Sequence, residues 1–401
     1  MAQLFSVKIQ KLDYRGQGIS WDLDRITFIP QALPGEEVLV ELTKIQAKQQ
    51  WGRIKQILRP SSKRIIPSCP HYAQCGGCHY LHLNYPDECQ AKVDVLQEQL
   101  TRLGHLDIYQ IPINVHPAPQ RNFYRQRLQL HYDRSENRIG LLAQGKIVEV
   151  PHCQLPLPGL KTAWQTLYPA NPATRSWPND IPSLGHVELA IQDGKVTTHW
   201  NQPYSADGFC QVNAVMNEQL KEVWRAKFQA GYQTSGPAPT HASGVLDLFG
   251  GNGNLSQACT TKEPVLVIDA HLPSDLGKKN ISSTGSEAHP INFFQTDLYA
   301  TDALEEAMVT ASSHQIKPPL AWLILDPPRS GHQEIAAWAK TWQAQNILYV
   351  SCNAATLARD LASLIPHYQL QSLDLFDFFP GTFHFETMAV LKRKTPGPKF
   401  I

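Results

Sequence analysis

The sequence predicts an α/β fold in which a doubly wound, mostly parallel sheet occupies the C-terminal half of the chain. Four continuous apolar runs, VLDLF, VLVID, AWLILD and ILYVS, begin between residues 245 and 347 and end in, or are followed by, small or acidic residues. Such runs are typical of buried parallel strands. Segments with helical periodicity alternate with them, at 211–229, 333–343 and 355–364. In this fold class, ligands bind at the carboxyl ends of the strands.

Two smaller domains are expected before this sheet. Residues 1–60 contain short apolar runs (LFSVKI, ITFI, EVLVEL and GRIKQIL) separated by the turn signals RGQG and LPGEE. This pattern predicts an OB-like β-barrel, a shape that often binds nucleic acid. Residues 61–205 predict a central α+β domain, with a helix over 91–104, a short helix near 160–168 and a sheet formed by alternating runs such as RLQLHY. Residues 206–401 then form the doubly wound domain.

The composition is that of an ordinary globular protein, with 42% hydrophobic and 18% charged residues in 401. No apolar run reaches the roughly 18 residues of a membrane span, and the start of the chain does not resemble a signal peptide. We therefore expect a cytoplasmic protein with no membrane contact; no protein partner is evident, and we expect a monomer. The net charge is +1, but residues 1–68 carry 11 Lys/Arg against 6 Asp/Glu, which is compatible with a nucleic-acid partner.

A cofactor site is predicted at the ends of the first strands of the sheet. The segment D-x-F-G-G-x-G-N (247–254) follows the first apolar run, where glycines let the backbone approach a nucleotide-like ligand closely. Asp269 ends the next strand, where it can accept hydrogen bonds from ribose, and Asp297 is placed to contact adenine. Each aspartate alone could merely cap a strand end. Three such features in strand order favour a Rossmann-like methyltransferase that uses S-adenosylmethionine.

The residues for catalysis are predicted at three later strand ends. LILDPPRSG places Asp326, VSCNAATLARD places Cys352, and FFPGTFHFETMAVL supplies Glu386. Methylation of uracil at C5 requires a thiolate that adds to C6 and a base that later removes the C5 proton. Cys352 and Glu386 suit these two roles, and Asp326 or Arg329 could polarise the uracil or position the thiol. A lone cysteine is more often a core thiol, but Cys352 follows its strand instead of lying within it.

Four further cysteines suggest a metal centre. In a reducing compartment a disulfide framework is not expected, and three of the eight cysteines fall within ten residues. Four thiolates suit either a [4Fe–4S] cluster or a structural zinc ion, and the neighbouring histidines are a reason to retain zinc as the alternative. The candidate ligands are Cys69, Cys75, Cys78 and Cys153.

These motifs together resemble the RNA uracil-C5 methyltransferases, and in particular the iron–sulfur branch that acts on bacterial 23S ribosomal RNA. The resemblance covers nearly the whole chain. LDYRGQGIS and FIPQALPGEEV look like a TRAM domain, and IIPSCPHYAQCGGCHYLHLNY looks like the family's cluster-binding region. The segments DPPR, SCN and FPGTFHFE occur in the order that this family shows.

The resemblance implies a fold, a reaction and a set of site residues. It implies a [4Fe–4S] cluster on the four cysteines, Cys352 as nucleophile and Glu386 as base. The sequence departs from the family's usual pattern at Gly250, Asn252 and Asp269, and its segment 270–290 is a poor helix. The implied contacts to S-adenosylmethionine are Gln211, Phe249, Asn254, Asp269, Asp297 and Asp326.

The expected substrate is RNA. Residues 121–134 carry four arginines with aromatic residues between them, and such a segment could clamp phosphates and stack on bases, or could be a solvated strand face. The resemblance favours ribosomal RNA, with transfer RNA as the alternative. Two other functions stay open: an amino-group methyltransferase that uses the DPPR segment, and a non-catalytic iron–sulfur RNA-binding protein.

Overall fold

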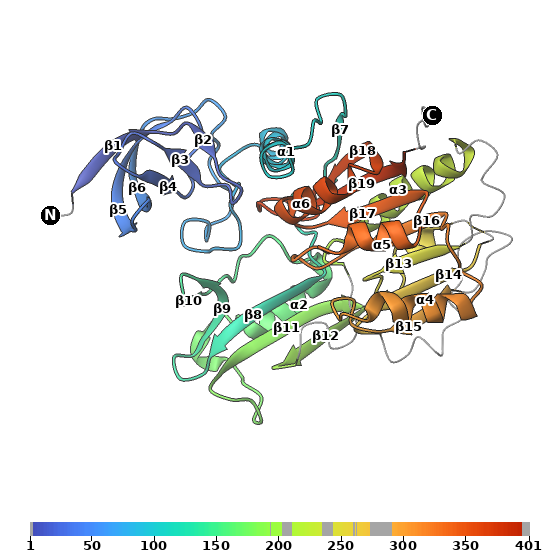
Figure 1. Ribbon diagram of the computed structural model, residues 1–401. Helices are drawn as coiled ribbons and strands as arrows, with labels where there is room; N and C mark the ends of the chain where they lie inside the picture. Colours follow the sequence, from blue (N-terminus) through green and yellow to red (C-terminus); the bar gives the residue numbers. More distant parts are fainter. Residues whose placement is uncertain are drawn as a thin grey trace.

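The computed structural model of the protein describes residues 3–192, 194–202, 211–234, 244–259, 261, 263–272 and 291–394. These residues form three sheets of six, five and eight strands. Figure 1 shows the six-stranded sheet at one end of the molecule, with the other two sheets beside each other. The predicted α/β methyltransferase fold with an N-terminal barrel-like domain is confirmed. None of the helices in these ranges is long and apolar enough to cross a membrane.

The N-terminal domain is a curled six-stranded sheet. Its long strands β5 and β6 pair antiparallel with three register shifts, and β6 also pairs in parallel with β4. Register shifts of this kind bend strands, so the sheet can curl around its own apolar side chains. Val7, Ile29, Val38 and Val40 form part of this small core. The strands are β1 (Leu4–Lys8), β2 (Lys11–Leu12), β3 (Gly18–Ser20), β4 (Ile26–Ile29), β5 (Glu37–Ile45) and β6 (Gln49–Arg59).

The central domain contains the expected sheet, which is antiparallel throughout, in the order β10-β9-β8-β11-β12. The helix expected near 160–168 is α2 (Lys161–Leu167), and it buries Trp164 and Leu167 against Leu130 and Val187 of the sheet. The strands are β8 (Arg127–Asp133), β9 (Arg138–Ala143), β10 (Lys146–Val148), β11 (Leu184–Gln192) and β12 (Lys195–Trp200).

The eight-stranded sheet contains the four apolar runs as parallel strands, as predicted. They are β13 (Val245–Leu248), β14 (Val265–Asp269), β16 (Trp322–Leu325) and β17 (Asn346–Ser351), with β15 (Ile291–Gln295) added at one edge. The other half was not foreseen. There β19 (Glu386–Arg393) pairs antiparallel with β17 and with β18 (Tyr368–Phe376), and β7 (Ile113–His116) completes the order β15-β14-β13-β16-β17-β19-β18-β7.

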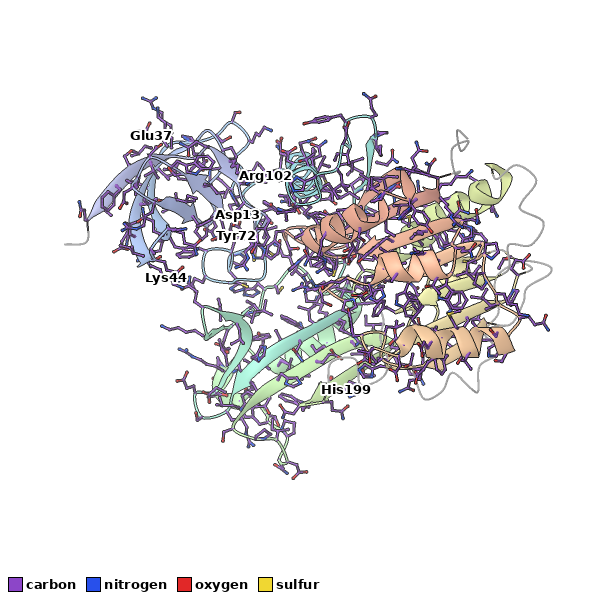
Figure 2. All side chains as sticks on the ribbon, in the orientation of Figure 1. Asp13, Glu37, Lys44, Tyr72, Arg102 and His199 are labelled. Atoms are coloured by element: carbon purple, nitrogen blue, oxygen red, sulfur yellow. The ribbon has the colours of Figure 1, made fainter. Side chains whose placement is uncertain are left out.

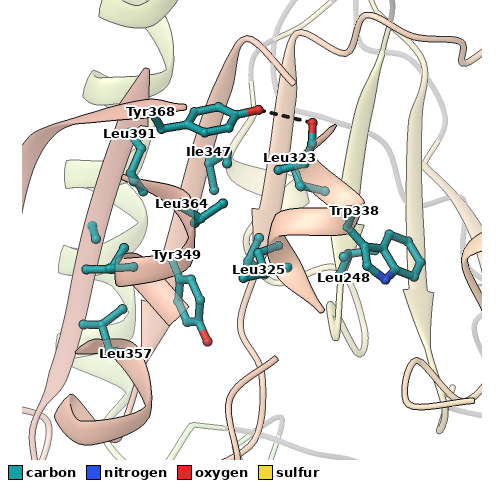
Figure 3. Close-up of a cluster of buried hydrophobic side chains, with 14 of the residues drawn as sticks. Leu248, Leu323, Leu325, Trp338, Ile347, Tyr349, Leu357, Leu364, Tyr368 and Leu391 are labelled. Atoms are coloured by element: carbon teal, nitrogen blue, oxygen red, sulfur yellow. Dashed lines mark hydrogen bonds between the residues drawn. The ribbon is translucent and has the colours of Figure 1, made fainter. Parts of the chain in front are cut away.

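Helices cover both faces of this sheet, because alternate side chains of each buried strand point to opposite faces. Leu246 and Leu323 face a core that includes residues of α4 (Ala303–Ser313), α5 (Ile335–Thr341) and α6 (Ala354–Leu364). Val245 and Trp322 face α3 (Ala214–Thr234), which buries Trp224 and Phe228. Figure 3 shows part of the first core, in which strand side chains pack against α5 and α6.

Helix α1 (Tyr85–Arg102) begins six residues before the predicted start at 91. Asn84 caps it by accepting a hydrogen bond from the amide of Asp87, and Pro86 occupies the first turn, where proline is well tolerated. The predicted end at Gly104 is close to the observed one. Although α1 and β7 lie within the range 61–205, α1 packs against α6 and β7 joins the eight-stranded sheet.

A buried ion network joins α1 to the loop after β18. The Lys92 ammonium has no exposed surface and lies 2.8 Å from a Glu88 carboxylate oxygen and 2.7 Å from an Asp377 carboxylate oxygen. Burial lowers the pKa of Lys92, but Asp377 and Glu88 more than offset this, so its pKa stays above the ordinary value. The two carboxylates thus keep the lysine charged inside the protein.

We predict that Lys92→Met lowers the free energy of unfolding by about 3–5 kcal/mol, because it leaves the buried Asp377 carboxylate without its cation, while Glu88 keeps Arg121. Urea unfolding followed by tryptophan fluorescence measures this change. The matched control is Lys146→Met at an exposed position, which should change the free energy by less than about 0.5 kcal/mol. Equal stability of the two variants would contradict a role for the network.

Candidate active site

Cys352 lies at the carboxyl edge of the eight-stranded sheet, between β17 and α6. It follows Ser351, the last residue of β17, and precedes Asn353, whose side chain caps α6 by accepting a hydrogen bond from the amide of Ala355 at 3.1 Å. The amide groups at a helix N-terminus stabilise negative charge. The N-terminus of α6 is therefore one influence that favours ionisation of the Cys352 thiol.

Glu386 lies beside Cys352 because their strands are neighbours. It is the first residue of β19, and the next residue, Thr387, pairs with Ser351. Because the strands are antiparallel, Cys352, which follows Ser351, and Glu386, which precedes Thr387, lie at the same end of the strand pair. Glu386 is 9% exposed. Asp326 joins them, since it follows β16, the other neighbour of β17.

The electrostatics of this edge favour protonated side chains. Burial, Glu386 and Asp326 together raise the pKa of the Cys352 thiol to about 12, against the opposing effect of Arg329. Burial and Asp326 raise the pKa of Glu386 well above its usual range, and Arg329 again opposes the shift. Burial and Asp269 raise the pKa of Asp326 to about 7. Paired, strongly shifted groups of this kind are typical of catalytic sites.

The Arg329 guanidinium opposes the rise in pKa at both Cys352 and Glu386. Residues of α6 and its cap hold the Arg329 loop in place. The side chains of Asn353 and Thr356 donate hydrogen bonds to the Arg329 carbonyl at 2.9 and 3.2 Å. Its guanidinium lies 3.4 Å from the ring of His384. Arg329 can therefore stabilise a thiolate at Cys352 without a large movement of the loop.

Cys352 opens into a cleft of about 890 Å³ whose walls come from the N-terminal barrel, from α1 with the loop before it, and from loops of the eight-stranded sheet. One wall is the turn after β2, a second is the C-terminal half of α1, and the third is the set of loops at the edge of the eight-stranded sheet. The polar and charged lining residues include Tyr14, Arg15, Gln17, His79, Glu98, Gln99, Arg102, Arg329, Asn353 and His384. A single base that has left its stack could enter a cleft of this size.

The glycine loop after β13 has the close backbone packing expected of a cofactor loop. Phe249 has a φ of +59°, an unusual conformation for a residue with a side chain and one that often marks a functional site. A Cβ at position 250 would lie 2.7 Å from Asp247 and from Val267, so only glycine fits there. Gly251 donates its amide to the Asp269 carboxylate at 2.9 Å.

The other residues expected at the cofactor have partners of their own. Asp269 accepts a second hydrogen bond from the amide of His271, and Asp297 accepts one from the amide of Tyr299. Asn254 pairs through its side-chain amide with Asn217 of α3 at 3.0 and 2.9 Å. Each carboxylate still has lone pairs for ribose or adenine, so these bonds orient the acceptors without blocking them.

Gln211 lies just before α3, and its backbone carbonyl accepts a hydrogen bond from Gln126 at 2.7 Å. Residues 208–210 of its motif, and residues 273–290 of the segment expected to be a poor helix, lie outside the described residues.

Asp247 is a further buried carboxyl near the glycine loop that was not among the predicted site residues. Burial raises the pKa of this carboxyl to about 7, and it lies under the glycine loop, where Ser256 donates a hydrogen bond to it. The sequence did offer a signal for Asp247, because it is the one charged residue in the apolar run VLDLF.

The four candidate metal ligands surround one small apolar pocket in the central domain. Cys69, Cys75, Cys78 and Cys153 line it together with aliphatic side chains. Gly77 donates its amide to the sulfur of Cys75 at 3.3 Å. In the described part of the chain, no three His, Cys, Asp or Glu side chains come close enough to hold a single metal ion.

Three of the four arginines of residues 121–134 have protein partners, and the expected phosphate clamp stays a prediction. Arg121 donates to Glu88 at 2.7 Å and to two backbone carbonyls, while Arg127 is 2% exposed and lies near Glu188. Arg134 donates to a backbone carbonyl. These side chains hold the central domain together. The positive charge in the cleft comes instead from the barrel, α1 and the DPPR loop.

Several known proteins are similar to this chain. A model of the tRNA (uracil-5-)-methyltransferase family matches residues 186–394. The 23S rRNA (uracil(1939)-C(5))-methyltransferase RlmD of Vibrio cholerae is 29% identical over 434 residues, which cover 97% of this chain and 96% of the relative. The protein of the same name from Shewanella sediminis is 28% identical over 447 residues, covering 96% and 95%.

One solved structure resembles the whole chain. The Pyrococcus abyssi tRNA (uracil-54, C5)-methyltransferase, crystallised with S-adenosyl-L-homocysteine, matches with a TM-score of 0.65 and 18% identity over 96% of this chain and 100% of that one. The likeness shows the fold. Fold and family define a methyltransferase, and in this chain a cysteine, Cys352, lies at the carboxyl edge of the sheet. The chain belongs to the tRNA (uracil-5-)-methyltransferase family.

We predict that Glu386→Gln increases the rate at which iodoacetamide alkylates Cys352 at pH 8–9. Glu386 raises the pKa of the Cys352 thiol, so removal of its charge lowers that pKa and increases the thiolate fraction at a given pH. Peptide mass spectrometry with time measures alkylation at this residue, with buried Cys89 as an internal reference. A slower reaction than in the wild type would show that the two side chains do not interact as described.

Proposed function

We propose that the protein transfers a methyl group from S-adenosylmethionine to C5 of a uridine in RNA, with 23S ribosomal RNA as the favoured substrate. The observation that carries this proposal is the placement of Cys352 at the start of α6, beside Glu386, in an open cleft. The printed names of the relatives from Vibrio cholerae and Shewanella sediminis support the ribosomal substrate. The family description supports transfer RNA as the second candidate.

The proposed mechanism divides the chemistry between two side chains. Cys352 gives its proton to water in the open cleft, and its sulfur forms a bond to C6 of uracil while the C5–C6 π bond breaks, which places an electron pair at C5. S-Adenosylmethionine, when bound, supplies an electrophilic methyl group for that electron pair. Glu386 then removes the C5 proton, the C5–C6 double bond forms again, and the C6–S bond breaks with the electrons returning to sulfur.

The surroundings of the two groups fit these steps. The N-terminus of α6 and Arg329 stabilise the thiolate that forms first. The buried position of Glu386 raises its pKa, which makes the ionised carboxylate a stronger base than one in water. Asp326, whose pKa is raised to about 7, lies close enough to influence both groups. We assign Asp326 to the cofactor site and to the positioning of the catalytic pair.

The remaining assignments follow the domain division. We propose that residues 1–60 bind RNA, that residues 61–205 hold a metal centre, and that residues 206–401 carry out catalysis. The tight loop at 250–251 and the acceptor oxygens of Asp269 fit an adenosyl ligand. We propose that the residues in contact with S-adenosylmethionine are Gln211, Phe249, Asn254, Asp269, Asp297 and Asp326.

We further propose that Cys69, Cys75, Cys78 and Cys153 hold a [4Fe–4S] cluster, with a zinc ion as the alternative. A tetrahedral zinc site would bring its sulfurs to about 3.8 Å from one another. The four thiols line one pocket, yet among the described residues they do not converge as ligands of a single ion. A cluster holds its thiolates farther apart than a single ion does. The cluster would stabilise the fold of the central domain, since uracil methylation transfers no net electrons.

We predict that the protein, purified without oxygen, contains about four iron and about four sulfide per chain. Cys153→Ser should lose most of both, because a cubane needs its fourth thiolate. Cys89→Ser, at a buried cysteine outside the pocket, is the matched control and should retain both. One zinc ion per chain with no sulfide would contradict the cluster and show that the four cysteines bind zinc.

We predict that wild-type protein forms 5-methyluridine in ribosomal RNA that lacks the modification, and that Cys352→Ser lowers this activity by at least about a thousandfold. Nucleoside mass spectrometry measures the product, and S-adenosylhomocysteine binding checks that the variant is folded. Product in transfer RNA but not in ribosomal RNA would select the second substrate. Full activity of Cys352→Ser would refute the mechanism and favour amino-group methylation.

A further inference from the structure

The turn that joins β2 to β3 is a rigid part of the catalytic cleft. The Asp13 carboxylate accepts hydrogen bonds from the amides of Arg15 and Gln17, at 2.9 and 2.7 Å, and from the side chain of Gln17 at 3.0 Å. Gly16 closes the turn with a φ of +73°, a conformation that favours glycine, and donates its amide to the Asp13 carbonyl at 3.0 Å. The turn therefore keeps one shape without help from a ligand.

This turn is held against the rest of the protein. A Cβ at position 16 would lie 2.8 Å from the ring of Tyr80, which is 1% exposed, so the backbone of the turn lies directly on that ring. Lys11 of β2 adds an ion pair to Glu98 of α1 at 2.7 Å. Figure 2 shows the labelled Asp13 and Arg102 at this junction of barrel and α1. The turn thus has a fixed position relative to Cys352.

Two side chains of the turn are left facing the cleft. Tyr14 is 53% exposed, although it stands on a turn that is otherwise well packed. The guanidinium of Arg15 lies 5.1 Å from the centre of the Tyr14 ring, so the pair presents an aromatic face and a positive charge together. Both residues line the same cleft as Cys352 and Asn353.

The charge of the cleft suits a phosphate. Arg15, Arg102 and Arg329 line it, whereas its one acidic lining residue, Glu98, is paired with both Lys11 and Arg102. An aromatic ring beside cationic groups is the combination with which proteins hold unpaired nucleotides: the ring stacks on a base and the cation contacts the backbone.

We propose that Tyr14 and Arg15 bind the nucleotide next to the methylated uridine, with Tyr14 stacked on its base and Arg15 on its phosphate. The proposal rests on the proposed function. A uridine that reaches Cys352 must leave its stack, and its neighbour then loses a stacking partner. Tyr14 replaces that partner at a fixed place in the cleft. These two residues position the substrate; they do not act on the reacting atoms.

The test uses the full chain with its metal centre and the RNA that the wild type methylates. Tyr14→Ala should raise KM for that RNA about 5- to 150-fold, the effect of one lost stacking contact, with kcat nearly unchanged. Tyr14→Trp should restore a low KM, whereas Tyr14→Leu, which keeps bulk without a flat ring, should not. Arg15→Gln should reduce the slope of log affinity against log salt by about 0.7.

Two controls separate stacking from simple docking of the barrel. Tyr109→Ala removes an exposed tyrosine outside the cleft and should leave KM unchanged. Lys11→Gln weakens the barrel–α1 contact, while the cleft residue Glu98 keeps its second partner, Arg102; if this variant raised KM as much as Tyr14→Ala, the role of the turn would be docking alone. The affinity of S-adenosylhomocysteine should be the same in all variants.

A synthetic RNA identifies the stacked nucleotide. Removal of the base on one side of the methylated uridine should raise KM for the wild type and cancel the further effect of Tyr14→Ala, because both changes remove the same contact. If Tyr14→Ala left KM within twofold of an active wild type, the inference would be wrong while the proposed function stood. If the wild type methylated no RNA, the proposed function itself would fail.

Discussion

The ion network around Lys92 connects the parts of the molecule that build the catalytic cleft. Lys92 lies on α1, its partner Asp377 follows β18, and Glu88 also accepts the amide of Gly381 at 2.6 Å. The amide of His79, from the cysteine-rich loop, donates to the carbonyl of the same glycine at 2.7 Å. The network therefore fixes α1, the cysteine-rich loop and the segment before Glu386 in one arrangement (Figure 1).

The meeting of Asp326, Cys352 and Glu386 at one edge follows from sheet topology. Parallel strands bring their carboxyl ends to one edge, which carries Asp326 and Cys352. The antiparallel β19 brings its amino end to that edge, so Glu386 arrives from the opposite chain direction. Cys352, Glu386 and Asp326 thus lie together with the Arg329 guanidinium, which opposes the rise in pKa that burial and the neighbouring carboxyl groups cause at Cys352 and Glu386.

The sequence predicted what depends on local pattern. The continuous apolar runs indicated β13, β14, β16 and β17, and the motifs around Cys352 and Glu386 indicated residues that do meet at the carboxyl edge of the sheet. The places of β7, β18 and β19 depend on pairing between distant segments, which periodicity does not reveal. The partners of Arg121 and Arg127 could not be predicted for a similar reason, because Glu88 and Glu188 lie far from them in the sequence.

The most direct test of the central claim is to incubate the protein with S-adenosylmethionine and ribosomal RNA that contains 5-fluorouridine. Fluorine replaces the proton that Glu386 should remove, so the final elimination cannot occur. We expect a covalent protein–RNA adduct that carries one added methyl group, with the RNA attached to Cys352 by mass spectrometry of the digested complex. Methyl transfer to RNA without any adduct, or an adduct at another residue, would contradict Cys352 as the nucleophile.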